Sequence, residues 1–291
     1  MKNEINKLRK NLDLCIGNRE KTTRSVSIAY SHSGKSYIAG NIETQTHLLN
    51  YSSEQNVLML SILNNDDKVY KIITMVETTD YKKKNVSPIV VKAMLDHISK
   101  THTDIEYEVY NVNGEKIFES KNINKLTGFY KPSKIFLSKF KDNKISNNRT
   151  KYRGKNIKDE LKKYSLQAIT RNFPNYDSAS GYGTAIITKK KNIYFGGQYS
   201  SPDNRLGYHS EIATIISALM NKDYEITHLG VVSSKFKDNV CNCCGICRQF
   251  ISEINQIFKT NIIIYNFAQD SDIYTKNTIK TYLPNQWTSK K

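Results

Sequence analysis

The chain has 291 residues, 38% of them apolar, which is enough for two domains of ordinary size or one large one. A polar start and the lack of a long apolar run predict neither a signal peptide nor a membrane span, so we expect no membrane partner. The net charge of +17 points towards nucleic acid, but 36 of the 44 basic residues are lysine. Because phosphate and base recognition favours arginine, we interpret the positive charge as a result of compositional drift and not of selection for binding nucleic acid.

The cysteines indicate a reducing environment. Four of the five lie between residues 241 and 247, which is too close a spacing for a disulfide framework. We therefore expect a cytoplasmic protein with free thiols.

An internal repeat organises the chain. The segment around Asn41 matches the segment around Gln198, and thirteen residues beyond these positions come Glu54 and Glu211 respectively. Each glutamate opens a stretch that has the apolar period of a helix. We therefore expect two copies of one folding unit.

Between the two copies lies a basic segment, residues 131–155, with nine basic residues and one acidic residue. We interpret it as a solvated linker, and an arm that binds nucleic acid is the alternative. The predicted domains are a degenerate, zinc-less copy over 1–130, the basic linker over 131–155 and the catalytic copy over 156–291.

The second copy alternates helices with strands. The predicted elements are a helix over 157–173, strands over 184–188 and 193–195, a helix from about 210, a strand over 229–232, a helix from about 244 and a strand over 261–267. This alternation predicts the α/β class, with a mixed sheet flanked by helices.

His209-Ser-Glu211 and Cys244-Gly-Ile-Cys247 together predict a catalytic zinc site. One histidine and two cysteines supply three ligands and leave the fourth tetrahedral position open for water. Both groups stand at predicted helix starts, where the helix dipole favours thiolates. Zinc lowers the pKa of bound water to near neutrality, and Glu211 is expected to move protons between that water, a pyrimidine ring nitrogen and the leaving ammonia. Arg248 is expected to hydrogen-bond a metal thiolate.

A purely structural zinc site is the main alternative, because Cys-x-x-Cys alone is as often structural as catalytic. The open fourth position and Glu211 favour catalysis. Cys241 and Cys243 are either packing residues or ligands of another site, and we assign them no role because Cys244 and Cys247 complete the set. In the first copy every ligand is lost: the three equivalent positions hold Ser52, Ile89 and Lys92.

In these residues both copies of the chain resemble the nucleoside-type cytidine deaminases. The family carries histidine or cysteine before Ala-Glu, then Pro-Cys-Gly-x-Cys-Arg-Gln, then Leu-Leu-Pro-x-x-Phe. The corresponding segments here are His209-Ser-Glu211, Cys243-Cys-Gly-Ile-Cys-Arg-Gln249 and Tyr282-Leu-Pro-Asn-Gln-Trp287. The resemblance is to dimeric, double-domain members with one inactive copy, here the N-terminal one. It implies two tandem three-layer α/β/α domains, a homodimer and a small pyrimidine nucleoside as substrate.

The resemblance also implies substrate contacts. The backbone around Ser210 and Cys244 would meet the pyrimidine edge. Trp287 or Tyr130, at the position of the family's terminal phenylalanine, would form an aromatic wall reaching a neighbouring active site.

The sugar-binding motif departs from the family pattern. Members bind ribose with Asn-x-Glu, which the first copy keeps as Asn41-Ile-Glu43, whereas the second copy has Gln198-Tyr-Ser200. Loss of a contact of this kind can change discrimination by orders of magnitude. The leading hypothesis is deamination of cytidine or deoxycytidine, and the alternative is a modified nucleoside, a nucleotide or cytosine in single-stranded nucleic acid. A non-catalytic binding module is disfavoured because Glu211 is intact.

Overall fold

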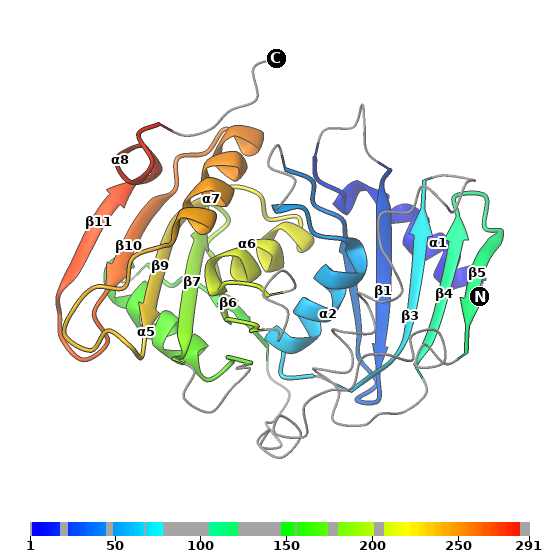
Figure 1. Ribbon diagram of the computed structural model, residues 1–291, viewed down its shortest axis with the longest axis horizontal. Helices are drawn as coiled ribbons and strands as arrows, with labels where there is room; N and C mark the ends of the chain where they lie inside the picture. Colours follow the sequence, from blue (N-terminus) through cyan, green and yellow to red (C-terminus); the bar gives the residue numbers. More distant parts are fainter. Residues whose placement is uncertain are drawn as a thin grey trace. The chain divides into compact units, whose positions relative to one another are not determined.

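In the computed structural model the chain divides into two units, Met1–Ile145 (unit 1) and Ser146–Lys291 (unit 2), which can be followed in Figure 1. The structure describes residues 2–17, 23–44, 49–66, 68–77, 105–121, 147–154, 156–173, 180–200 and 207–285. Within these ranges, no helix has the length and apolar character needed to cross a membrane.

In its described residues, unit 1 forms a five-stranded mixed sheet with a helix on each face. The strand order is β2-β1-β3-β4-β5, in which only β3 and β4 are parallel. Its elements are α1 (Lys2–Lys10), the 3-10 turn η1 (Leu12–Leu14), β1 (Ser25–Ser31), β2 (Ser36–Gly40), α2 (Ser53–Leu63), β3 (Val69–Val76), β4 (Glu106–Asn111) and β5 (Lys116–Ser120).

Alternation along β1 explains how both faces of this sheet are covered. Val26 and Ile28 point to the face that α1 covers with Leu8, forming one apolar cluster. Ser27, between them, points to the opposite face and hydrogen-bonds Ser53 at the start of α2 at 2.8 Å. Successive side chains of a strand lie on opposite faces, so one strand supports both helices.

Unit 2 repeats this architecture with a six-stranded mixed sheet of order β11-β10-β9-β7-β8-β6. The helix α5 covers one face and α6 the other, with α7 beside α6. Its elements are β6 (Arg149–Lys151), α5 (Ile157–Ile169), β7 (Tyr182–Thr188), β8 (Asn192–Gly197), α6 (Ser210–Met220), β9 (Ile226–Ser233), α7 (Gly245–Phe258), β10 (Ile263–Phe267), β11 (Tyr274–Thr278) and α8 (Ile279–Tyr282).

The predicted α/β class with mixed sheets flanked by helices is confirmed for both units. One predicted helix is too long: α5 ends at Ile169, because Phe173 leaves the helix and forms a bridge with Tyr199. Within the range interpreted as a linker, Arg149–Lys151 form β6 and pair with β8. The part of that range before residue 147 lies outside the described residues.

The repeat is visible in the structure at a constant separation of 157 residues. Ile42 bridges Tyr51 in unit 1, and Tyr199 bridges Tyr208 in unit 2. Each bridge leads directly into the helix that carries the matching glutamate, α2 or α6. Positions 157 residues apart are called equivalent below.

The two units differ in how closely a helix approaches the sheet. A Cβ atom on Gly183 would come within 2.0 Å of the Ser165 carbonyl oxygen of α5, and one on Gly230 would come within 2.9 Å of a leucine side chain of the same helix. The Ser165 hydroxyl donates to the Gly230 carbonyl at 2.9 Å. The equivalent positions in unit 1 are Val26 and Ile73, which pack under α1. Only unit 2 therefore seats its helix directly on the backbone of the sheet.

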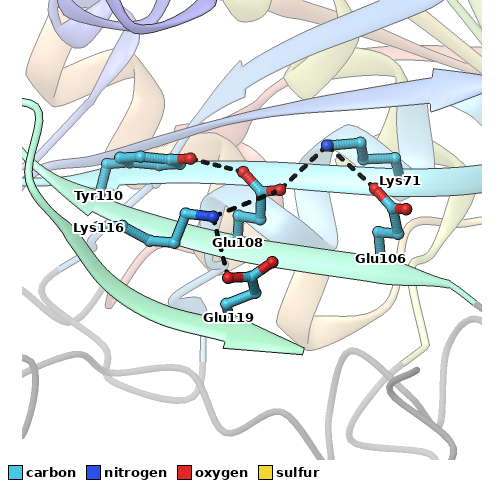
Figure 2. A network of polar contacts seen from close by, with 6 residues as sticks. All are labelled: Lys71, Glu106, Glu108, Tyr110, Lys116 and Glu119. Carbon is cyan, nitrogen blue, oxygen red and sulfur yellow. Dashed lines mark hydrogen bonds and ion pairs between the residues drawn. The ribbon is translucent and has the colours of Figure 1, made fainter. Parts of the chain in front are cut away.

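A polar network lies on the α1 face of the unit 1 sheet, towards its outer edge. Figure 2 shows its members, which are Lys71, Glu106, Glu108, Tyr110, Lys116 and Glu119. Glu108 is its centre, with the Tyr110 hydroxyl at 2.7 Å and the Lys71 ammonium at 3.1 Å. Burial alone would raise the pKa of Glu108, but the bonds from Tyr110 and Lys71 and the lysine charge outweigh it and lower the pKa. The carboxylate is therefore held ionised.

Candidate metal centre

Three side chains of unit 2 meet at the N-terminal ends of two helices. His209 is the N-cap of α6 and Cys244 is the N-cap of α7, and neither uses its side chain to cap its helix. His209 Nδ1 lies 3.2 Å from the Cys244 sulfur and 3.4 Å from the sulfur of Cys247, one turn into α7. Their ligand atoms all lie within 4.8 Å of one another. The structure thus brings together the three ligands that the sequence predicts.

The donor set fits zinc. Zinc bonds of about 2.0 Å to nitrogen and about 2.3 Å to sulfur in a tetrahedron place nitrogen and sulfur about 3.5 Å apart. The two nitrogen–sulfur distances given above are close to that value, and three ligands leave one tetrahedral position for water. Among the described residues, this is the only group of His, Cys, Asp and Glu side chains close enough to hold a metal ion.

The cysteine pair carries negative charge where a metal ligand needs it. Hydrogen bonds from Cys247 and His209 lower the pKa of Cys244 to about 3 despite its partial burial. Its partner Cys247 donates to that thiolate and is buried, so the pKa of Cys247 is raised. The hydrogen bond to the Cys244 thiolate likewise raises the pKa of His209. A thiolate is the form of cysteine that binds metal.

Glu211 stands in the first turn of α6, two residues after His209, and only 5% of it is exposed. Its Oε2 accepts a hydrogen bond from the Ser210 hydroxyl at 3.2 Å, and that hydroxyl also contacts Thr184 of β7 at 2.8 Å. The helix start and the sheet thus fix the carboxylate near the sulfur ligands.

The loop before Cys244 is anchored by Arg248. Its guanidinium donates to the Cys243 carbonyl at 2.8 Å and to the Tyr282 carbonyl at 3.1 Å, and it lies 5.1 Å from the Tyr282 ring centre. These bonds connect the cysteine loop to the C-terminal segment. The expected bond from Arg248 to a thiolate stays a prediction.

A polar group behind this loop has no counterpart in the sequence predictions. The buried amide of Asn266 on β10 donates to Asn242 at 3.2 Å and to the Tyr282 hydroxyl at 2.5 Å. The Cys243 sulfur lies 3.9 Å from the Asn266 carbonyl oxygen. The only sequence signal for this group is that Asn266, a polar residue, interrupts an apolar strand pattern.

Cys241 and Cys243 are buried thiols beside the centre. Burial raises the pKa of Cys241 to about 12, and burial with the nearby Glu211 charge raises that of Cys243. Both therefore stay protonated, and neither belongs to the ligand group of His209, Cys244 and Cys247.

The predicted sugar-binding residues lie next to this centre in the fold. Gln198 and Ser200 flank Tyr199, which bridges Tyr208, the residue before His209. The Gln198 amide donates to the Ser200 hydroxyl at 2.8 Å. Trp287 and Tyr130, the predicted aromatic wall, lie outside the described residues.

In unit 1 the position equivalent to His209 has a different role. Ser52 accepts a hydrogen bond from the Gln55 backbone at 3.2 Å, while the Gln55 side chain accepts one from the Ser52 backbone at 3.0 Å. This capping box uses the side chain that a metal would need. Ile89 and Lys92 lie outside the described residues.

Solved structures similar to the chain include cytidine deaminases from three bacteria. The protein from Burkholderia pseudomallei has 20% identity and a TM-score of 0.40, covering 44% of this chain and 98% of its own. That from Mycobacterium tuberculosis has 18% identity and a TM-score of 0.37, covering 45% and 96%. That from Mycobacterium leprae has 17% identity and a TM-score of 0.35, covering 44% and 97%. No model of a protein family and no curated protein sequence matches the chain.

Proposed function

We propose that the protein is a zinc-dependent hydrolase that converts cytidine or deoxycytidine to the uracil nucleoside and ammonia. The observation that carries the proposal is the approach of His209 Nδ1 to two cysteine sulfurs, at 3.2 and 3.4 Å, with Glu211 on the same helix start. The resemblance of these motifs to cytidine deaminases supports the same reaction. In this proposal residues 156–291 are the catalytic domain and 1–130 a degenerate copy.

His209, Cys244 and Cys247 would hold the zinc ion. When bound, zinc would lower the pKa of a water molecule so that the water can attack a ring carbon near neutral pH. Zinc binding would displace the protons of Cys247 and His209, so that two cysteine thiolates balance the charge of the ion and a neutral histidine adds none. Zinc dependence is therefore tested directly by metal analysis and by removal with a chelator.

Glu211 would carry the protons. Its carboxylate takes one proton from the attacking water and gives it to the pyrimidine ring nitrogen, and a second transfer converts the leaving amino group to ammonia. The net reaction consumes one water and releases one ammonia. Burial at 5% exposure and the bond from Ser210 hold the carboxylate in one orientation for this work.

The choice of substrate depends on Gln198 and Ser200. They form a neutral pair, joined at 2.8 Å, whereas unit 1 keeps Asn41 bonded to the Glu43 carboxylate at 3.1 Å. A neutral pair does not repel a phosphate group. This difference favours, as the second candidate, a modified nucleoside, a nucleotide or single-stranded nucleic acid as substrate.

One assay separates these substrates. Purified, zinc-loaded protein is incubated separately with cytidine, deoxycytidine, their nucleotides and single-stranded oligonucleotides, and ammonia release is followed. We expect release from the free nucleosides. Conversion of oligonucleotide without conversion of nucleoside would contradict the first choice.

We also propose that the protein is a homodimer, which light scattering on the same sample tests. We propose a cytoplasmic location because all five cysteines are free thiols.

Replacing Glu211 tests the proposed proton carrier. We expect Glu211→Ala to lower kcat by a factor of roughly 100 to 10,000 while zinc content stays at one ion per chain. The measurements are ammonia release and metal analysis on the same preparation. His209→Ala is the matched control, because it should lose both zinc and activity. Loss of zinc from Glu211→Ala would mean that the carboxylate supports the metal instead.

A further inference from the structure

The glutamate of unit 1 that is equivalent to Glu211 is tied down by hydrogen bonds from the sheet. Glu54 is fully buried, and its Oε1 accepts from the Tyr107 hydroxyl at 2.7 Å and from the Thr74 hydroxyl at 3.1 Å. Its Oε2 accepts from Ser53 at 3.2 Å. Both sheet donors stand on the face that α2 covers. The carboxylate therefore serves as a fixed acceptor in the core of unit 1.

Unit 2 has apolar residues in place of these two donors. Val231 of β9 and Ile264 of β10 are equivalent to Thr74 and Tyr107, and the pairing of neighbouring strands gives the same equivalence. Both side chains are fully buried. The side chains of valine and isoleucine donate no hydrogen bond, so neither can hold the Glu211 carboxylate from the side of the sheet.

The serine before each glutamate makes the same two contacts in both units. Ser53 and Ser210 each donate to the following glutamate at 3.2 Å, and they contact a hydroxyl of β1 and of β7, respectively, at 2.8 Å. The two glutamates have the same backbone position and the same serine, but on the sheet side Glu54 has two donors that Glu211 lacks. From the side of the cysteine loop, Glu211 has a hydrogen bond with the Cys243 thiol.

We propose that Val231 and Ile264 are positioning residues for the reaction of unit 2, acting through Glu211. A carboxylate that carries protons must turn between the water and the substrate nitrogen with its oxygen atoms open. Two donors from the sheet would occupy one oxygen and fix the side chain against the strands, as they do for Glu54. The apolar pair prevents this. The inference rests on the proposed deamination and adds the residues that keep its proton carrier available.

Val231→Thr is the sharpest test because threonine has nearly the shape of valine. It adds one hydroxyl at the position from which Thr74 reaches Glu54. Val232→Thr is the matched control: it puts the same hydroxyl one residue further along β9, on the opposite face, in the fully buried cluster under α5. Both variants bury a new hydroxyl, and because only the one at position 231 has Glu211 as an acceptor, Val232→Thr should lose at least as much stability as Val231→Thr.

We expect Val231→Thr to lower kcat by a factor of about ten or more, with KM and zinc content unchanged. Val232→Thr should keep the kcat of the parent protein. Equal kcat in the two variants would overturn the inference. Loss of zinc in Val231→Thr would also overturn it, because the residue would then support the metal centre and not the carboxylate.

A second measurement is independent of turnover. The loss of stability caused by Val231→Thr is compared in the parent chain and in Glu211→Ala by denaturant unfolding. We expect the unfolding equilibrium constant to rise about fivefold more in Glu211→Ala, where the new hydroxyl has lost its acceptor. An equal rise in both backgrounds would contradict the inference. If the parent protein deaminates no substrate, the proposed function fails, and this comparison still decides whether position 231 contacts Glu211.

Discussion

At the scale of single residues, Glu108 shows how a buried charge is stabilised in unit 1. Its side chain is 7% exposed, and Lys71, 18% exposed, lies 3.1 Å away. Bonds to Tyr110 and Lys71 favour the charged form over the protonated one. A carboxylate whose pKa is lowered on folding stabilises the fold above its unfolded pKa, and this contribution is lost as the pH falls through the folded pKa.

We therefore expect Glu108→Gln to lower the free energy of unfolding by about 1–3 kcal/mol at pH 7. The difference from the parent protein should shrink as the pH falls below 4.5, the ordinary pKa of a glutamate, and the parent carboxylate takes up a proton. Denaturant unfolding at several pH values measures it. Glu119→Gln is the control in the same network, since its half-exposed pair with Lys116 is worth little at any pH. A constant difference between Glu108→Gln and the parent would refute the explanation.

The meeting of His209, Cys244 and Cys247 could be foreseen from the sequence because helix starts have strong local signals. His209 and Cys244 each precede a stretch with helical period, so their side chains could be placed at two N-termini. The pair Val231 and Ile264 could not be foreseen. In the sequence they are ordinary core residues, and only the strand register shows that they replace Thr74 and Tyr107.

At the scale of elements, the sequence predicts the strands that have an apolar pattern and misses those that have none. The strands β9 and β10 have apolar runs, and both are confirmed. The strand β11, Tyr274–Thr278, is at the sheet edge, pairs with β10 and is exposed or half-buried along its length. Such a polar edge strand has no hydrophobic period to reveal it. The short strand β6 and the four-residue helix α8 were missed for the same reason.

The close packing of α5 gives a prediction about glycine. We expect Gly183→Ala to lower the stability of unit 2 by about 3 kcal/mol or more, because its Cβ would lie 2.0 Å from the Ser165 carbonyl oxygen. Gly245→Ala is the control, since a Cβ there would meet nothing within 4 Å. Urea unfolding, followed by a spectroscopic signal that reports on unit 2, measures the stability of both variants. Equal midpoints for the two variants would show that α5 can move away at little cost.

At the scale of the whole molecule, the two units differ in what should stabilise them. Within the described residues, only unit 2 has a group of three His, Cys, Asp or Glu side chains that could hold a metal ion. A ligand that binds the folded state stabilises it in proportion to the logarithm of its concentration. We expect zinc at a hundred times its dissociation constant to stabilise unit 2 by about 2.7 kcal/mol and to leave unit 1 unchanged.

Hydrogen exchange can locate this effect. Amides of α6 and α7 should become more protected with zinc and less protected with a chelator, whereas those of α2 should not respond. His209→Ala should remove the response. Equal protection in both units, or protection that survives His209→Ala, would show that zinc acts elsewhere. The net charge of +17 makes nonspecific binding of anions a necessary control in these samples.

The glycines of the sheet face under α5 also affect which helix can pack on which sheet during folding. Two units that share the order of five strands in one polypeptide are at risk of exchanging equivalent helices. If α5 packed on the unit 1 sheet, its Ser165 carbonyl would clash with the side chains of Val26 and Ile73. If α1 packed on the unit 2 sheet, a void would remain between Leu8 and Gly183. Each mismatch costs on the order of 1–3 kcal/mol or more. We therefore expect each helix to fit the sheet of its own unit better than the sheet of the other.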